Sequence, residues 1–110
     1  MAVIAISNTG GNFSATTTWV GDVVPTSIDD IICTATSGQL TIDTTTCVCK
    51  SIDFTNYVNT LTYTATQTLT VSGTYKQVAG MTVSGQGTLV ITATSTITSV
   101  GLTFNGSLTF

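Results

Sequence analysis

The feature that most constrains this chain is a short pattern that returns about every 20 residues. The pattern is an apolar residue, Thr and a second apolar residue. It recurs at Leu40-Thr-Ile42, Leu61-Thr-Tyr63, Met81-Thr-Val83 and Leu102-Thr-Phe104, with spacings of 21, 20 and 21 between the starts. A second series starts at Leu69, Leu89 and Leu108, with spacings of 20 and 19. Repeats of this length with two or three short strands are typical of one coil of a β-solenoid.

The residues between the repeats favour strands throughout. From residue 39 onward, Thr or Ser alternates with apolar residues, as in 60–71 and 88–98. This period of two is the signal of a β-strand. Ile52-Asp-Phe54 indicates a further, less regular strand. We therefore predict an all-β chain, a right-handed parallel β-helix (β-solenoid) with coils of about 20 residues. A small antiparallel β-sandwich is the alternative, since it also has short strands with frequent turns.

The first third of the chain differs from the rest. Residues 1–38 contain the only Trp, the only Pro and three of the five Asp residues. We predict that 1–38 form an N-terminal cap or attachment segment and that 39–110 form the solenoid repeats. The repeat is interrupted at Phe110, so we expect the natural chain to continue beyond it. The residues expected to cover the first coil are Trp19, Val20, Val23, Val24, Ile28, Ile31 and Ile32.

The charge content argues against several classes of function. The 110 residues include five Asp, two Lys and no His, Arg or Glu, which gives a net charge of −3. Without His, the usual general base at neutral pH is missing, and the many Ser and Thr residues have no triad partner. Without Arg there is no basic footprint for nucleic acid. A neutral surface that is rich in Thr suits a protein that is assembled with other copies.

The termini and the cysteines indicate little about processing. No Lys or Arg precedes the short apolar run in Met1–Ser7, so we expect no signal peptide and no membrane helix. The odd number of cysteines argues against a disulfide framework. We expect Cys33, Cys47 and Cys49 to be small buried apolar residues. A Cys33–Cys47 or Cys33–Cys49 disulfide is the alternative, and zinc is disfavoured because there is no C-x-x-C and no His.

Residues 11–32 carry a resemblance to a known group of proteins. They read Gly11-Asn-Phe-Ser, then Thr18-Trp-Val-Gly-Asp-Val-Val-Pro25, then Asp29-Asp-Ile-Ile32. This resembles the segment that opens many bacterial and bacteriophage surface β-solenoid proteins, with Phe13 in place of a Trp and Asp22 in place of a Gly. Residues 50–57 and 101–110 are similar to repeats of phage fibres and adhesin-like proteins. The resemblance implies a right-handed parallel β-helix in a virion or extracellular appendage.

The carboxylates suggest two sites, and for each a structural role is favoured. Asp29 and Asp30, with Asp22 nearby, offer oxygen ligands for calcium, but no D-x-D-x-D-G loop is present. We expect them to bond turn amides instead. Asp43 and Asp53 are the candidates for a glycosidase carboxylate pair. Each alternates with apolar residues, which indicates an outward solvent face, so we assign no catalytic, cofactor-binding or metal-binding residue.

Two surface functions follow from the Thr and Tyr residues. A ladder of Thr pairs on successive coils could bind ice, as in β-helical antifreeze proteins, which the alternating Thr runs resemble. In a frame of about 20 residues the position after Thr60 and Thr62 falls on Gly80 and Thr82, so we expect the ladder to be broken. Tyr57, Tyr63 and Tyr75 suggest a sugar-stacking platform. They share no position in the frame, so we expect them at the core edge or an interface.

The sequence thus favours a non-enzymatic structural protein without a cofactor, from a phage fibre, spike or other appendage. Its partners would be further copies, with a trimer as the analogy with fibres suggests, and other appendage proteins. No nucleic acid and no membrane insertion are expected. A host- or glycan-binding adhesin module is one alternative, and a polysaccharide depolymerase is another. The oligomer number, the attachment partner, the host receptor and the redox state of the cysteines do not follow from the sequence.

Overall fold

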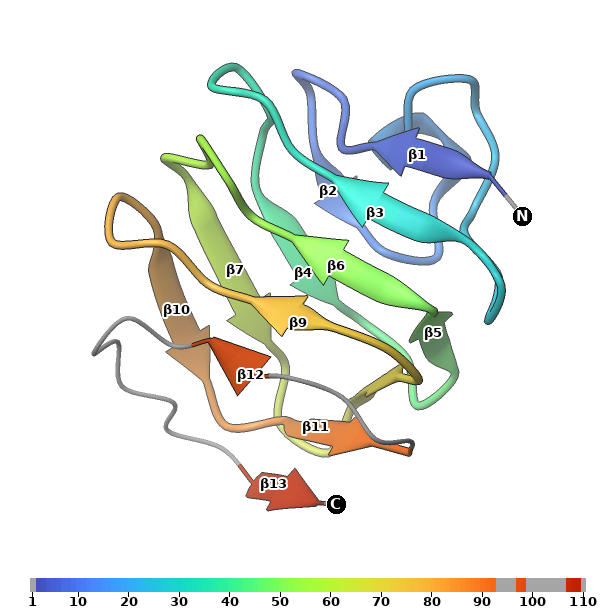
Figure 1. Cartoon of the computed structure of the whole chain (residues 1–110), viewed down its shortest axis with the longest axis vertical. Helices are drawn as coiled ribbons and strands as arrows, with labels where there is room; N and C mark the ends of the chain where they lie inside the picture. Colours follow the sequence, from blue (N-terminus) through green and yellow to red (C-terminus); the bar gives the residue numbers. More distant parts are fainter. Residues whose placement is uncertain (1, 93–96, 99–106, 110) are drawn as a thin grey trace.

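The computed structural model describes residues 2–92, 97–98 and 107–109, and they form an all-β protein (Figure 1). The only helix among these residues is one short 3-10 turn, η1 (Thr16–Thr18). The prediction of an all-β chain is confirmed. The strands are β1 (Val3–Ala5), β2 (Gly11–Asn12), β3 (Asp30–Ile32), β4 (Leu40–Ile42), β5 (Cys47–Cys49), β6 (Ser51–Asp53), β7 (Thr60–Tyr63), β8 (Thr68–Val71), β9 (Tyr75–Lys76), β10 (Thr82–Gly85), β11 (Thr88–Ile91), β12 (Ile97–Thr98) and β13 (Ser107–Thr109).

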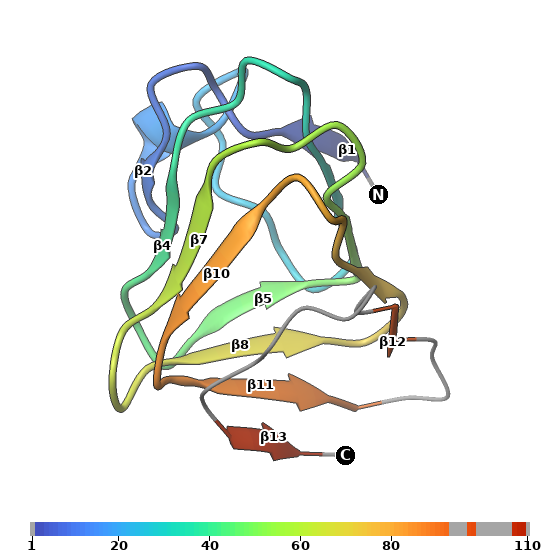
Figure 2. The same cartoon turned by 90° about the vertical axis from the view of Figure 1, so that its left-hand side faces the viewer.

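The strands form three sheets, and every pair of neighbouring strands described is parallel. Sheet 1 has the order β1-β3-β6-β9-β12, sheet 2 has β10-β7-β4-β2, and sheet 3 has β13-β11-β8-β5. From β4 to β12 the chain visits sheet 2, sheet 3 and sheet 1 in turn; we call one such passage a coil. Figure 2 shows sheet 2 on the left and sheet 3 below it. All described strand pairs are parallel, which excludes an antiparallel sandwich for them. The antiparallel bridge between Ile6 and Trp19 lies outside these strands.

The predicted repeat places most of the inward residues of two sheets correctly. Leu40 lies beside Leu61 in sheet 2, as the first spacing of the pattern predicts. Leu69, Leu89 and Leu108 lie beside one another in sheet 3, at the predicted spacings of 20 and 19. The triplet Leu102–Phe104 and the terminal Phe110 lie outside the described residues. The apolar-Thr-apolar pattern therefore identifies strands that stack directly on one another.

One predicted register position is wrong. Leu61 pairs with Val83 rather than with Met81, so the spacing in this coil is 22 instead of 20. Met81 instead closes a turn, in which its backbone N–H donates to the carbonyl of Val78 at 3.3 Å. The strand begins one residue later, at Thr82. A shift of two residues keeps the same side chains inward, because side chains alternate with period two along a strand.

Much of the remaining sheet structure lies outside the predicted repeat. Sheet 1 contains a third inward column, Ile4, Ile31, Ile52 and Tyr75, with each residue beside the next. Its β6 is the strand expected around residues 52–54. Cys47 and Cys49 form the first strand of sheet 3 and lie beside Leu69 and Val71. Together with Cys33, these cysteines are buried and free, as the apolar interpretation predicted.

The N-terminal third is built differently from the predicted cap. Its strands β1 and β3 belong to sheet 1, and β2 belongs to sheet 2. Both sheets therefore contain strands from before and after the predicted boundary at residue 38. Trp19 is buried: its ring packs edge-on against Phe13 at 4.9 Å, and its Nε1 donates to the Phe13 carbonyl at 2.9 Å. Ile31 is buried and Val24 is partly buried. The other residues expected to cover the first coil are exposed, namely Val20, Val23, Ile28 and Ile32.

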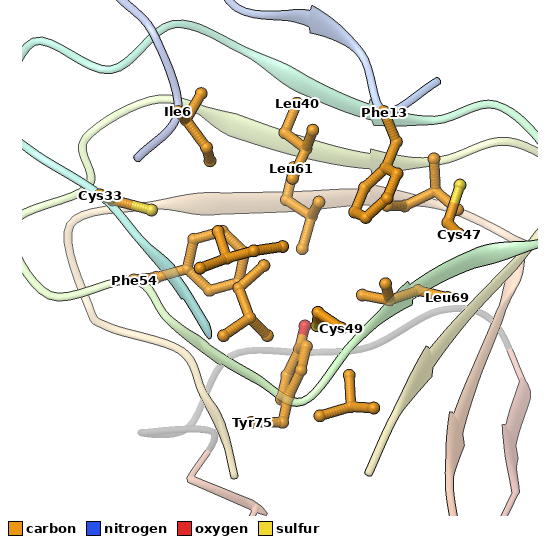
Figure 3. Close-up of a cluster of buried hydrophobic side chains, with 14 of the residues drawn as sticks. Ile6, Phe13, Cys33, Leu40, Cys47, Cys49, Phe54, Leu61, Leu69 and Tyr75 are labelled. Carbon is orange, nitrogen blue, oxygen red and sulfur yellow. The ribbon is translucent and has the colours of Figure 1, made fainter. Parts of the chain in front are cut away.

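The alternation of side chains explains which of these residues are buried. Ile31 points inward from β3, so Ile32 points outward, and the same alternation separates Trp19 from Val20. The core lies between the three sheets. Figure 3 shows residues from all three of them, including Leu40, Leu61, Leu69, Phe54 and Tyr75, directed into one cluster. Because the core fills the space between the sheets, a binding site would have to lie on their outward faces.

Candidate functional site

The carboxylate of Asp29 is part of a local turn. Its Oδ2 accepts from the backbone N–H and the hydroxyl of Thr26 at 2.9 and 3.0 Å, and its Oδ1 accepts from the N–H of Ala2 at 2.9 Å. The bond from the Thr26 N–H lowers the pKa of Asp29 despite the opposing effect of burial. These contacts match the turn-amide role expected from the sequence rather than a calcium site.

The other two members of the suggested calcium site do not complete it. Asp30 points outward from sheet 1 and accepts from the hydroxyl of Ser51 at 2.6 Å. Asp22 lies in an exposed turn with a φ of 57°. Among residues 2–92, 97–98 and 107–109, no group of three or more His, Cys, Asp or Glu residues is placed to hold a metal ion.

The two carboxylates considered for glycoside hydrolysis lie on different sheets. Asp43 follows β4 in sheet 2 and accepts from the N–H of Ser14 at 3.0 Å and from the Ser14 hydroxyl. Asp53 lies in β6 of sheet 1 and accepts from the N–H and the hydroxyl of Thr55 at 2.9 and 2.6 Å. Burial raises the pKa of Asp53, but the bonds from Thr55 and the charge of Lys76 outweigh it and lower that pKa. The structure does not bring these carboxylates together as a pair.

The three tyrosines lie in the core, not on a sugar-binding platform. The hydroxyl of Tyr57 donates to the carbonyls of Gly38 and Thr60 at 2.7 and 3.0 Å. The hydroxyls of Tyr63 and Tyr75 are 2.9 Å apart, and that of Tyr75 donates to Oε1 of the buried Gln77 at 2.7 Å. Burial raises the pKa of all three tyrosines. The expected position at the core edge or an interface is therefore wrong, because all three are fully enclosed.

The outward side of sheet 2 carries a set of hydroxyl and amide side chains in register, which we call the hydroxyl face. In one column Asn12, Thr41, Thr62 and Ser84 lie beside one another, and in a second column Thr60 lies beside Thr82. The hydroxyls of Thr62 and Ser84 are 3.2 Å apart. The prediction of a broken Thr ladder is wrong, because the spacing after Thr60 is 22 rather than 20. A frame that allows two-residue shifts would have found Ser84 from the sequence.

The three sheets present different outward surfaces. Sheet 1 carries charge, with Asp30 on β3 and with Asp53 beside Lys76 on β6 and β9. On sheet 3 the outward residues include Val48 and Val90, which flank Thr70. Sheet 3 also has outward hydroxyl residues in register, Thr68 beside Thr88, but Val48 and Val90 interrupt its other column. On the hydroxyl face of sheet 2 both columns carry hydroxyl or amide residues, and neither contains a charged residue. The hydroxyl face is the candidate site that the described residues define best.

The described residues offer no other obvious site. No pocket or cavity is found among residues 2–92, 97–98 and 107–109. Within that part of the chain, no helix has the length and apolar character needed to span a bilayer. No family model, curated protein or solved structure matches this chain.

Proposed function

We propose that this chain is a non-enzymatic structural module of a virion or other surface appendage, built as a right-handed parallel β-helix. The supporting observation is the stacking of parallel strands in three sheets, which the chain visits in a fixed order from β4 to β12. In such a solenoid each coil contacts only its neighbours, so stiffness would come from the stack of coils as a whole. The resemblance of residues 11–32 to bacterial and phage surface solenoids supports the appendage as its location.

Self-association is part of this proposal. The structure measures 31 × 26 × 24 Å, so one chain is nearly as wide as it is long. A stiff fibre would therefore need several such units, and homo-oligomers are the ordinary way to supply them. Most of the large apolar residues that are exposed in the described part of the chain lie at or before Ile32, and they offer contact area for such assembly. They are Val3, Val20, Val23, Ile28 and Ile32.

The glycan-binding and depolymerase alternatives have less support. Sugar sites in proteins use exposed aromatic rings, whereas the Tyr, Trp and Phe residues among the described positions are buried. A retaining or inverting glycosidase needs two carboxylates facing one substrate. Asp43 and Asp53 occupy different sheets and are each hydrogen-bonded to a neighbouring Ser or Thr. We therefore keep the structural role as the proposal.

Two measurements on the full chain test this proposal. Sedimentation velocity at micromolar concentration should show oligomers above the monomer mass, whereas a strict monomer would contradict self-assembly. In electron microscopy, gold-labelled antibodies against the chain should bind to appendages of virus particles or cells from a culture that expresses the protein. Label confined to the cytoplasm of intact cells would contradict the appendage location. Pre-immune serum is the control for the labelling.

A further inference from the structure

We propose that the hydroxyl face of sheet 2 binds the surface of ice. The face consists of Thr41 on β4, Thr60 and Thr62 on β7, and Thr82 and Ser84 on β10. These five hydroxyls lie in two columns that follow the stacking of the coils, and Asn12 of β2 extends the first column. This activity does not depend on the appendage role, because it needs only the fold of one chain.

The spacing of the hydroxyls on this face is regular in two directions. Parallel strands lie about 4.8 Å apart, and side chains two positions apart along a strand are separated by about 6.6 Å. Threonine side chains are restricted at χ1 because they are β-branched, so their hydroxyls have few positions available. The contact of 3.2 Å between Thr62 and Ser84 further orders one column. Ice likewise presents a fixed two-dimensional lattice of oxygen atoms.

A hydroxyl group is also chemically suited to such a lattice. It donates one hydrogen bond and accepts others, as a water molecule does. Asn12 and Thr82 are exposed, and Thr41, Thr60, Thr62 and Ser84 are half-buried, so each of these residues is partly accessible to water. Ordered water on these groups can therefore continue into the crystal without a break in its hydrogen bonding.

The same face lacks what other classes of ligand require. No pocket for a small molecule is found among the described residues. The two columns carry no Lys for a phosphate, no exposed aromatic ring for a sugar and no large apolar side chain for a lipid. The nearest carboxylate in sequence, Asp43, is bonded to Ser14 at the margin of the sheet. An ordered lattice of water is the partner that fits a neutral, pocket-free array of hydroxyls.

The test uses the full chain in an ice-recrystallisation assay and in ice-affinity partitioning. Thr62→Lys places a long cation in the centre of the face, and Thr82→Lys does so at an exposed position of the other column. The matched control is Thr70→Lys on sheet 3, which is also outward and half-buried. Thermal unfolding confirms that each variant is folded. Binding to insoluble polysaccharides is measured in parallel with the same proteins.

We expect the parent chain and Thr70→Lys to slow recrystallisation at micromolar concentration and to enter ice. The two substitutions on the hydroxyl face should reduce both effects at least fivefold. No effect of the parent chain beyond that of an unrelated protein of equal size would overturn the proposal. An equal loss in Thr70→Lys would also overturn it. Polysaccharide binding that is lost with Thr62→Lys, without ice activity, would assign the face to a glycan instead.

Discussion

At the residue scale, Thr66 occupies a backbone conformation that does not suit it. Its φ is 70°, in the left-handed region that β-branched residues rarely adopt. The N–H of Gln67 donates to the carbonyl of Thr64 at 3.0 Å, which makes Thr66 the third residue of a tight turn between β7 and β8. Glycine or asparagine is usual at such a position. The turn is therefore held by the sheets on either side rather than by its own sequence.

Replacement of this residue should stabilise the protein. We predict that Thr66→Gly raises the free energy of unfolding by about 1 kcal/mol, because Gly removes the steric cost of the left-handed conformation. Thr64→Gly, at an exposed position of the same turn without a positive φ, should lower it by about 0.5–1 kcal/mol. Urea unfolding measures both variants. A decrease in stability for Thr66→Gly would contradict the strain argument.

Gly73 shows how closely neighbouring coils approach. A Cβ at this position would lie 2.7 Å from the backbone carbonyl oxygen of Lys50, whereas at Gly80 the nearest atom would be 3.6 Å away. We predict that Gly73→Ala lowers the free energy of unfolding by about 2–3 kcal/mol because the backbone of the adjacent coil must shift. Gly80→Ala, the matched control, should change it by less than about 0.5 kcal/mol. Equal unfolding midpoints in urea for the two variants would show that the coils are not held this closely.

At the scale of the elements, β1 depends on a side chain from the loop before β3. Asp29 accepts from the N–H of Ala2, and the neighbouring N–H of Asp30 donates to the carbonyl of Ala2 at 2.8 Å. We predict that Asp29→Ala increases amide hydrogen exchange in Val3–Ala5 while β8 stays protected. Asp22→Asn is the control, since it removes an exposed carboxylate while Asn tolerates the left-handed backbone at this position. Unchanged exchange in β1 would show that pairing with β3 alone is sufficient.

The length of the connections explains which elements could be predicted. In sheet 3 the spacing between stacked residues is 20 and then 19 from β8 onward, and there the predicted pairs of Leu69, Leu89 and Leu108 are confirmed. In sheet 1 the spacing between stacked residues is 21 from Ile31 to Ile52 and 23 from Ile52 to Tyr75. The predicted repeat does not include this column. Because Met81 closes a turn, Val83 takes the position beside Leu61 that the repeat predicts for Met81, a difference of two residues. Unequal turns hide a repeat from sequence comparison although the strands still stack.

At the scale of the whole molecule, burial of the thiols sets the response to alkali. Burial raises the pKa of Cys33 and of Cys49 from 9.0 to about 12, with a smaller effect from Asp53 on Cys33 and from Asp30 on Cys49. In the unfolded chain these thiols lose their protons near pH 9, but in the folded chain they lose them only near pH 12. Between these values the folded state binds more protons, so stability falls as the pH rises.

We predict that the free energy of unfolding is nearly constant from pH 7 to 8.5 and falls above pH 9. The slope should approach about 1.4 kcal/mol per pH unit for each of the two thiols. The buried tyrosines should steepen the fall above pH 10, since burial also raises their pKa. Urea unfolding under reducing conditions from pH 7 to 11 measures this. For the double variant Cys33→Ala, Cys49→Ala, the free energy of unfolding should stay constant up to pH 10. An equally constant free energy of unfolding in the parent chain would contradict the prediction.

Sequence alone is sufficient to predict the class of structure and, for the predicted strands that the structure describes, the inward face. Both depend on the alternation of side chains along a strand, which is a local property of an extended backbone. Leu40, Ile42, Leu61 and Leu69 are buried as that alternation requires.

Only the tertiary structure decided which residues of different coils lie side by side. That pairing depends on how many residues each turn contains, and the connection closed by Met81 makes the spacing between Leu61 and Val83 22 residues instead of 20. In β10 the register differs by two residues from the predicted one, and this difference places Ser84 beside Thr62 on the hydroxyl face. A one-dimensional pattern can reveal that strands stack, but their register is a property of the packed coils.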